Sequence, residues 1–156
     1  MALDQLQQFI SDLDAFDFEA SMSGVILDNK DIISDMVAAQ LGSTSLDGNN
    51  NPVLLDGSGY ADSTIRYKQE HGQGLGAITD RVTLYQTGEL YKMIDTEVVV
   101  DEVQTMSDVP YYDELMQRTG EDVMKLNETN RIDFATEILM PAFSQEFLEK
   151  TGLQIT

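Results

Sequence analysis

The sequence predicts an α+β fold: a small antiparallel sheet with flanking helices and one long loop, in a single domain over residues 1–156. Three observations predict this class. Apolar residues recur at helical spacing near both ends of the chain, two β-branched runs lie in the middle, and residues 42–62 are dense in Gly, Ser, Asn and Asp. At 156 residues the chain is long enough to bury a sizeable apolar core.

Two helices are expected in the N-terminal part of the chain. Apolar residues between Leu3 and Phe16 follow i, i+3, i+4 spacing, which is typical of an amphipathic helix. A second apolar stripe predicts a helix from Asn29 to Leu41. Gly42 follows directly, where a glycine commonly ends a helix.

The segment after the second helix predicts a long loop and then a short helix. Residues 42–62 form the loop, and loops of this length in compact domains are commonly functional arms or poorly ordered segments. Ser63 can cap a short helix that carries Ile65 and Tyr67, because a serine hydroxyl accepts from a free N–H of the first turn. The glycines from Gly72 onward end this helix.

The middle of the chain predicts strands around one short helix. Val82 and Leu84 alternate with polar residues, which indicates a half-buried strand. Thr87-Gly88 follows, where Thr87 can cap a helix that begins at Gly88 or Glu89. Two further strands are expected, which a turn at Asp101-Glu102 would join into a hairpin: Ile94–Val100 and Val103–Met106.

The C-terminal part predicts two more helices. A short helix over Tyr111–Gln117 ends at Gly120. A longer helix starts near Thr129, is kinked or restarted at Pro141, and ends at Gly152.

The net charge is the most unusual property of the composition. Nine bases against 28 acids leave a charge of −19, a field that repels nucleic-acid phosphates and anionic membrane surfaces. Residues 1–29 hold six acids and no base, and residues 93–117 hold seven acids and no base. The N-terminus lacks the positive charges of a signal peptide and no apolar run is long enough to span a bilayer, so we expect a soluble protein.

No motif in the sequence identifies an enzyme, and we expect no catalytic residues, no cofactor and no metal. The absence of cysteine excludes disulfides and thiolate sites. Residues 71–77, HGQGLGA, do not have the dinucleotide-binding spacing, and His71 is the only histidine. Residues 46–59 approach a calcium loop, but Pro52 stands where the glycine is needed and Ser58 where a bidentate Glu is needed.

Residues 60–94 resemble a pattern in small head-to-tail connector (neck, or tail-completion) proteins of tailed bacteriophages, those of crAss-like phages of gut bacteria among them. A later segment, Pro110–Tyr112 followed by Gly120, is also similar. The positions that carry the resemblance are Tyr60, Tyr67, Lys68, Gly72, Val82-Thr83-Leu84 and Thr87-Gly88. Four of them form what we call the family-pattern corner: Val82, Leu84, Thr87 and Gly88.

The resemblance implies a structural virion protein that is made in the host bacterial cytoplasm. Copies of the chain would form a twelvefold or sixfold ring in the neck or tail, in contact with adjacent portal, neck or tail proteins. DNA would pass through this ring without specific binding, and an acidic wall would let it slide because it repels phosphates.

Two sets of charged residues become candidate sites under this hypothesis. The acids expected to face the channel are Asp95, Glu97, Asp101 and Glu102. The bases expected to meet acids of a neighbouring copy are Arg66, Lys68, Arg81 and Lys92.

Two other functions stay open on the sequence alone. An acidic DNA mimic that inhibits a nucleic-acid enzyme would explain the charge equally well. A small hydrolase with paired carboxylates would need two acids that converge in a deep cleft, which no spacing in this chain announces.

Overall fold

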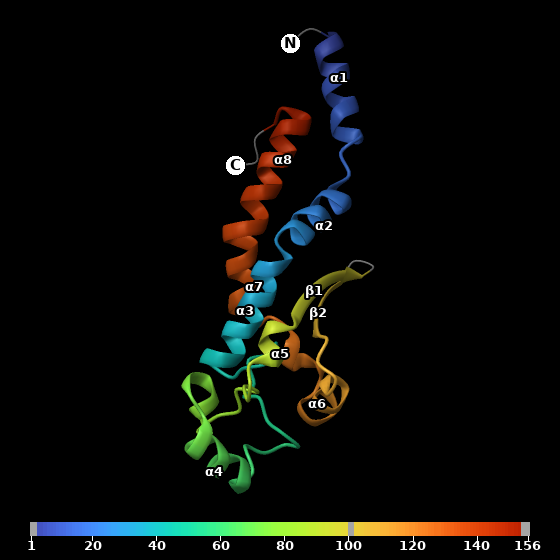
Figure 1. Ribbon diagram of the computed structural model, residues 1–156. Helices are drawn as coiled ribbons and strands as arrows, with labels where there is room; N and C mark the ends of the chain where they lie inside the picture. The colour runs from blue at the N-terminus through green and yellow to red at the C-terminus, as the bar shows by residue number, and fades with distance from the viewer. Residues whose placement is uncertain (1–2, 100–101, 154–156) are drawn as a thin grey trace. The chain divides into compact units, whose positions relative to one another are not determined.

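The computed structural model describes residues 3–99 and 102–153 and confirms the α+β class (Figure 1). Its sheet has two antiparallel strands, β1 and β2, and the remaining elements are helical. In chain order the elements are α1 (Leu3–Asp14), α2 (Phe18–Asp28), α3 (Lys30–Ser43), α4 (Asp62–His71), the 3-10 turn η1 (Gly74–Ala77), α5 (Glu89–Lys92), β1 (Ile94–Val99), β2 (Glu102–Ser107), α6 (Tyr112–Thr119), the 3-10 turn η2 (Glu121–Met124), α7 (Glu128–Phe134), the π-helical turn η3 (Ala135–Leu139) and α8 (Met140–Thr151).

The chain forms two compact units. Unit 1 combines the two ends of the chain, Met1–Asn29 and Ile132–Thr156, and unit 2 comprises Lys30–Arg131. Each unit has a hydrophobic cluster of its own. That residues 1–156 form a single domain remains a prediction from the sequence.

Unit 1 is held together by an aromatic cluster between the two ends of the chain. The ring of Phe16 packs edge-on against Phe143 and Phe147 of α8, with centroid distances of 5.9 and 5.0 Å. Asp17 caps α2, since its carboxylate accepts the Ala20 N–H at 2.9 Å. The sequence pattern predicts no element at α2, because its apolar residues surround the helix and form no single stripe.

A π-helical turn precedes Pro141 in the last helical segment. Pro141 is the second residue of α8, and α8 directly follows the turn Ala135–Leu139. A proline ring crowds the carbonyl four residues earlier and offers no N–H, and the wider π turn accommodates both effects. The predicted helix end is confirmed: Gly152 has a φ of 73° and donates its N–H to the Leu148 carbonyl at 2.8 Å.

The core of unit 2 packs against one side of helix α3, which contributes Val37 and Leu41 to it. Its buried members are Val37, Leu41, Val53, Val82, Val123 and Met124. The expected helix stop at Gly42 is wrong, because α3 continues to Ser43 and Gly42 is buried within it. A Cβ at Gly42 would lie 2.9 Å from Leu75 Cδ1, so this glycine permits close packing rather than ending the helix.

The expected strand around Val82 is wrong. Residues 81–85 run without a strand partner, and Leu84 has a φ of 56° that no regular strand contains. Tyrosine side chains replace the missing partner: the Tyr60 hydroxyl accepts the Thr83 N–H at 3.1 Å, and the Tyr91 hydroxyl donates to the Thr83 carbonyl. Val82 is buried, and the backbone next to it forms hydrogen bonds with side chains instead of with a neighbouring strand.

The predicted antiparallel hairpin is confirmed over its described residues. Strands β1 and β2 pair in the register Ile94↔Ser107 to Val99↔Glu102. The sequence pattern placed Glu102 in the turn, and this is wrong, because Glu102 is the first residue of β2. The expected strand end at Val100 and the turn residue Asp101 lie outside the described residues.

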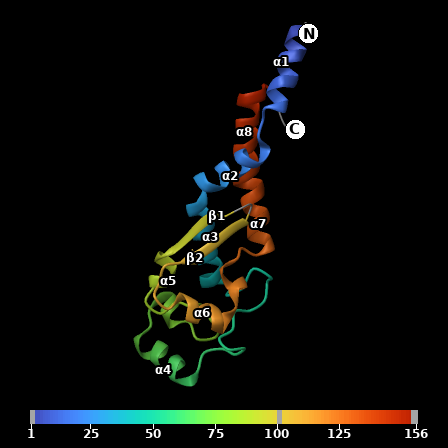
Figure 2. The ribbon, with the colours of Figure 1, turned by 90° about the vertical axis from the view of Figure 1, so that its right-hand side faces the viewer.

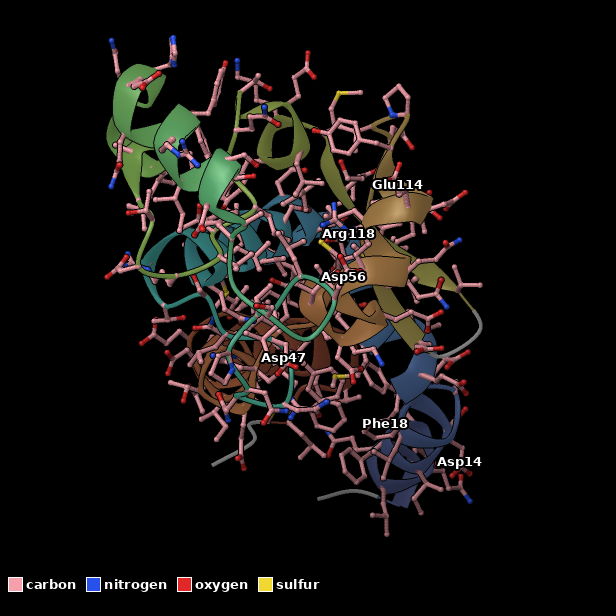
Figure 3. The ribbon with its side chains drawn as sticks, turned by 90° about the horizontal axis from the view of Figure 1, so that it is seen from below. Asp14, Phe18, Asp47, Asp56, Glu114 and Arg118 are labelled. Carbon is pink, nitrogen blue, oxygen red and sulfur yellow. The ribbon has the colours of Figure 1, made fainter. Side chains whose placement is uncertain are left out.

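The long loop between α3 and α4 belongs to unit 2 and is internally hydrogen-bonded. The Asp47 carboxylate accepts the Asn49 and Asn51 N–H groups at 2.8 and 2.9 Å, which makes a tight turn. Figure 3 shows Asp56 beside Arg118 of α6, and the Arg118 Nε donates to Asp56 Oδ2 at 2.9 Å.

The structure confirms helices α4 and α6, but the predicted N-cap of α4 is wrong. Helix α4 begins at Asp62 with Ala61 as its N-cap, so the expected Ser63 cap is wrong. The predicted end of the helix before Gly72 is confirmed. Helix α6 is confirmed, with Gly120 at a φ of 90° directly after it.

Candidate functional site

The β1–β2 hairpin brings together the described acids that the sequence singles out. Alternate strand residues point to opposite faces, and residues directly opposite each other share a face. By the register Asp95↔Met106, Glu97↔Gln104 and Val99↔Glu102, three acids therefore share one face of the hairpin: Asp95, Glu97 and Glu102. We call it the acidic hairpin face. Asp101 lies outside the described residues.

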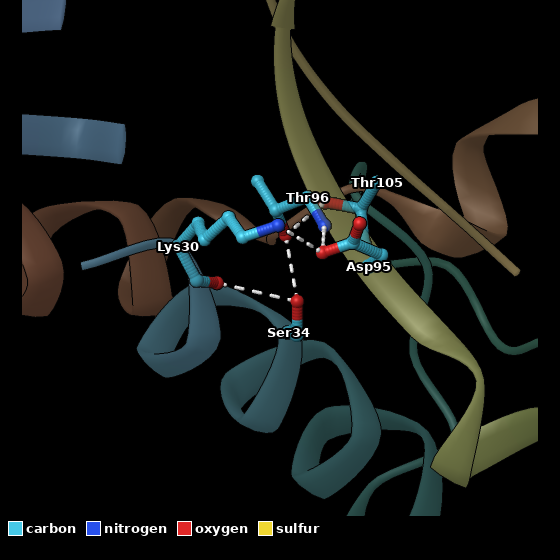
Figure 4. A network of polar contacts seen from close by, with 5 residues as sticks. All are labelled: Lys30, Ser34, Asp95, Thr96 and Thr105. Carbon is cyan, nitrogen blue, oxygen red and sulfur yellow. Dashed lines mark hydrogen bonds and ion pairs between the residues drawn. The ribbon is translucent and has the colours of Figure 1, made fainter. Parts of the chain in front are cut away.

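The opposite face of the hairpin is fixed to α3 by hydroxyl groups. The Ser34 and Thr96 hydroxyls lie 2.9 Å apart, and the Thr96 and Thr105 hydroxyls 3.4 Å apart (Figure 4). Thr96 is fully buried in this contact. Because buried hydroxyls need partners, this chain of contacts sets which face of the hairpin turns away from α3.

Asp95 is paired within its own unit, whereas Glu97 and Glu102 are exposed. The Lys30 ammonium lies 2.8 Å from Asp95 Oδ1, which also accepts the Thr96 N–H at 2.9 Å (Figure 4). The hydrogen bond from Lys30, followed by that from Thr96, lowers the pKa of the Asp95 carboxyl. The same bond to Asp95 raises the pKa of Lys30. The negative field of this face therefore comes mainly from Glu97 and Glu102.

The lowered pKa of Asp95 gives a measurable pH dependence. Because the folded-state pKa lies below the ordinary value of about 3.9, the ion pair stabilises the fold above that value. This contribution is lost as the pH falls through the lowered pKa. We expect ¹³C NMR to show the Asp95 carboxyl titrating below its ordinary range.

A matched pair of lysine variants tests the cause of this shift. Lys30→Met should move the pKa of Asp95 back toward the ordinary value, because it removes the hydrogen bond from Lys30 that lowers this pKa most. Lys92→Met removes an exposed lysine elsewhere in unit 2 and should leave it unchanged. An Asp95 titration that is the same in both variants would contradict the assignment.

The sequence did not reveal that Lys30 pairs with Asp95. It stands 65 residues before Asp95, on a different element, and no periodicity or motif connects the two positions. Only the packing of α3 against β1 brings them together.

The four bases expected at a subunit interface occupy different environments. Arg66 and Lys92 are exposed. Arg81 is partly buried, and its guanidinium lies 3.4 Å from both Asp80 Oδ1 and the Gly42 carbonyl. The assignment of Lys68 to an interface is wrong, because this residue is 4% exposed.

Lys68 instead acts as a buried structural cation. Its ammonium donates to the Tyr85 carbonyl at 2.8 Å and to the Gly76 carbonyl at 3.2 Å. It also lies 4.7 Å from the centre of the Tyr60 ring. No carboxylate among the described residues forms an ion pair with it, so these neutral groups compensate the charge.

The family-pattern corner is a tight backbone turn without a strand before it. Val82 is buried, and Leu84 has the positive φ described above. The Thr87 hydroxyl accepts the Glu89 N–H at 3.4 Å, a long contact. Gly88 has a φ of 84°, and a Cβ there would lie 2.7 Å from the Tyr85 hydroxyl. A glycine is therefore required at this position on both steric and conformational grounds.

A shallow depression of about 390 Å³ lies beside the start of β1. Its lining residues are Asp31, Ser34, Asp35, Tyr91, Lys92 and Ile94. Burial raises the pKa of the Tyr91 hydroxyl, which remains a donor to the Thr83 carbonyl. The depression thus carries two carboxylates on successive turns of α3 and one ammonium at its rim.

The remaining sequence candidates hold positions with ordinary structural roles. His71 is exposed on α4, stacked on Tyr67 with a ring distance of 4.7 Å. Asp47 uses its carboxylate to bind backbone N–H groups of its own turn. Among the described residues, no three His, Cys, Asp or Glu side chains gather closely enough to hold a metal ion.

No protein-family model, curated protein sequence or solved structure matches this chain. Within residues 3–99 and 102–153, none of the helices combines the length and the apolar character needed to cross a bilayer.

Proposed function

We propose that this chain is a structural protein of a phage virion that forms a ring in the neck or tail, connects the portal to the tail and surrounds the DNA channel. The observation that carries the proposal is the acidic hairpin face, on which Asp95, Glu97 and Glu102 lie together. The resemblance of residues 60–94 to neck proteins supports the same role.

The charge gives this role a physical mechanism. Each phosphate that a cationic wall contacts adds to the affinity for DNA, so a wall of bases would hold the genome in place. Exposed carboxylates act in the opposite sense, because they repel the phosphates at distances within the Debye length of about 8 Å at physiological salt. A ring lined by Glu97 and Glu102 would let DNA slide during packaging and ejection.

Cryo-EM and quantitative mass spectrometry of purified particles of the virus that encodes the chain test the proposal. We expect copy numbers that are multiples of six, and a ring whose axis the acidic hairpin face approaches. Particles that lack the chain would overturn the proposed function. A ring with Glu97 and Glu102 on its outer rim would overturn the channel assignment alone.

A charge-reversal pair tests the role of the hairpin acids directly. Glu97→Lys with Glu102→Lys should slow DNA release from particles, because the added cations attract phosphates. Glu70→Lys with Glu128→Lys changes the net charge equally, at exposed positions on α4 and α7, and serves as the control. Equal release rates for the two doubly substituted viruses would contradict the channel role.

A second candidate, an acidic DNA mimic that inhibits a nucleic-acid enzyme, is favoured by the net charge of −19. Stoichiometric inhibition of a nuclease by the purified chain, lost in Glu97→Lys with Glu102→Lys, would support this candidate over the ring.

A further inference from the structure

Helix α1 carries an apolar stripe that its own unit covers at the C-terminal end and leaves exposed at Leu6 and Ile10. Leu6, Ile10 and Leu13 recur at i, i+4 and i+7 and therefore share one side of the helix. Leu13 packs against the aromatic cluster of unit 1. Leu6 and Ile10 are 42% and 48% exposed, and the first turns of α1 extend past the end of α8 (Figures 1 and 2).

A helix in this situation needs a partner for its stability. Helices shorter than about 12–15 residues are marginal in water by themselves, and most helical stability in proteins comes from packing of an apolar face. Helix α1 has 12 residues, and among its described side chains only Leu13, in the last turn, packs against the aromatic cluster. The uncovered stripe at Leu6 and Ile10 is thus the part that a partner would stabilise.

The charge around this stripe restricts the chemistry of the partner. Residues 1–29 contain six acids and no base, and residues 132–156 add four acids against Lys150 alone. Three of the acids stand on α1 itself: Asp4, Asp12 and Asp14. A second copy of so acidic a unit, an anionic membrane or a nucleic acid would be repelled from this helix.

We propose that α1 is a docking helix that inserts Leu6 and Ile10 into an apolar groove on a different protein, and that this groove is rimmed by Lys and Arg. An amphipathic helix that lays its apolar side into a groove is a common mode of peptide recognition. Here the groove would cover the stripe, and its basic rim would pair with the acids of α1. This inference goes beyond the ring function and does not depend on it.

A synthetic probe of the stated chemistry tests the proposal on the full chain. The probe is an amphipathic helical peptide with leucines at i, i+3 and i+4 spacing and lysines elsewhere. We expect saturable one-to-one binding by calorimetry that weakens as salt is added. Hydrogen exchange should slow by about tenfold in residues 4–13, since docking stabilises a marginal helix.

Matched variants separate docking from general charge attraction. Leu6→Ser with Ile10→Ser should lower the affinity for the probe by at least about tenfold. Leu54→Ser with Ile132→Ser removes the same residue types, 43% and 54% exposed, outside α1 and should leave the affinity unchanged. Circular dichroism of both proteins shows whether the rest of the fold is retained.

Four results would overturn the inference. If the two doubly substituted proteins bind the probe equally well, the binding comes from charge attraction alone and not from insertion of Leu6 and Ile10. If a peptide with glutamates in place of the lysines binds equally well, the partner needs no basic rim, and the proposed chemistry of the groove is wrong. Self-association that Leu6→Ser with Ile10→Ser abolishes would make a second copy the occupant. Binding of α1 to anionic vesicles would make it a membrane anchor.

Discussion

Replacing Lys68 by methionine is expected to lower the free energy of unfolding by about 3 kcal/mol. The ammonium of Lys68 joins three segments of unit 2, because it bonds to the Gly76 and Tyr85 carbonyls and lies over the Tyr60 ring. Methionine keeps most of the apolar stem but leaves both carbonyls without this donor. Urea unfolding at neutral pH, followed by circular dichroism, measures the loss.

Arg66→Met is the matched control for this variant. Arg66 is on the same helix, two positions earlier, and is exposed. Surface substitutions of this kind change stability by less than about 0.5 kcal/mol. If the two variants unfold at the same urea concentration, Lys68 does not hold the three segments together.

Replacing Gln40 by leucine is expected to have an effect of similar size, about 3 kcal/mol. Gln40 is 3% exposed and uses its whole amide. Its Nε2 donates to the Leu46 and Lys125 carbonyls at 2.8 and 3.1 Å. Its Oε1 accepts the Asn127 N–H and an Asn130 side-chain N–H, both at 2.9 Å. Leucine has a similar volume but leaves these groups in the interior without partners.

Two further variants test whether hydrogen bonding at Gln40 causes the loss. Gln117→Leu makes the same substitution at an exposed position on α6 and should be nearly neutral. Gln40→Glu should be more destabilising at pH 7 than at pH 4, because a carboxylate facing two carbonyls is disfavoured and its folded-state pKa is raised. The native protein then binds more protons than the unfolded one, so stability falls as the pH rises. A pH-independent loss would argue against this geometry.

The sequence correctly predicted those elements whose signals are local. These signals are the Leu3–Phe16 stripe, the β-branched runs Ile94–Val100 and Val103–Met106, and the glycines at 120 and 152, and the structure has an element or helix end at each of them. Helical periodicity, strand alternation and left-handed helix ends are all properties of a few consecutive residues. The sequence did not place the three acids on one hairpin face, because the expected turn at Asp101-Glu102 implies a different register from the observed pairing of Val99 with Glu102.

The mistaken predictions are those in which a distant residue supplies the partner. Residues 81–85 have the pattern of a strand, but Tyr60 and Tyr91 take the backbone bonds of Thr83. Gly42 has the position of a helix stop, but the approach of Leu75 is what requires it. Both outcomes depend on contacts between segments that no short window of sequence contains.

By itself the amino-acid sequence determined the α+β class, the helices at both ends, the hairpin and the −19 charge, because these depend on composition and local spacing. The tertiary structure alone decided that Lys68 is a buried structural cation, that Lys30 pairs with Asp95, and that Leu6 and Ile10 are uncovered. Burial and pairing are relations between segments far apart in the chain. The free energy of a charged or apolar side chain depends on those neighbours, which a one-dimensional pattern does not contain.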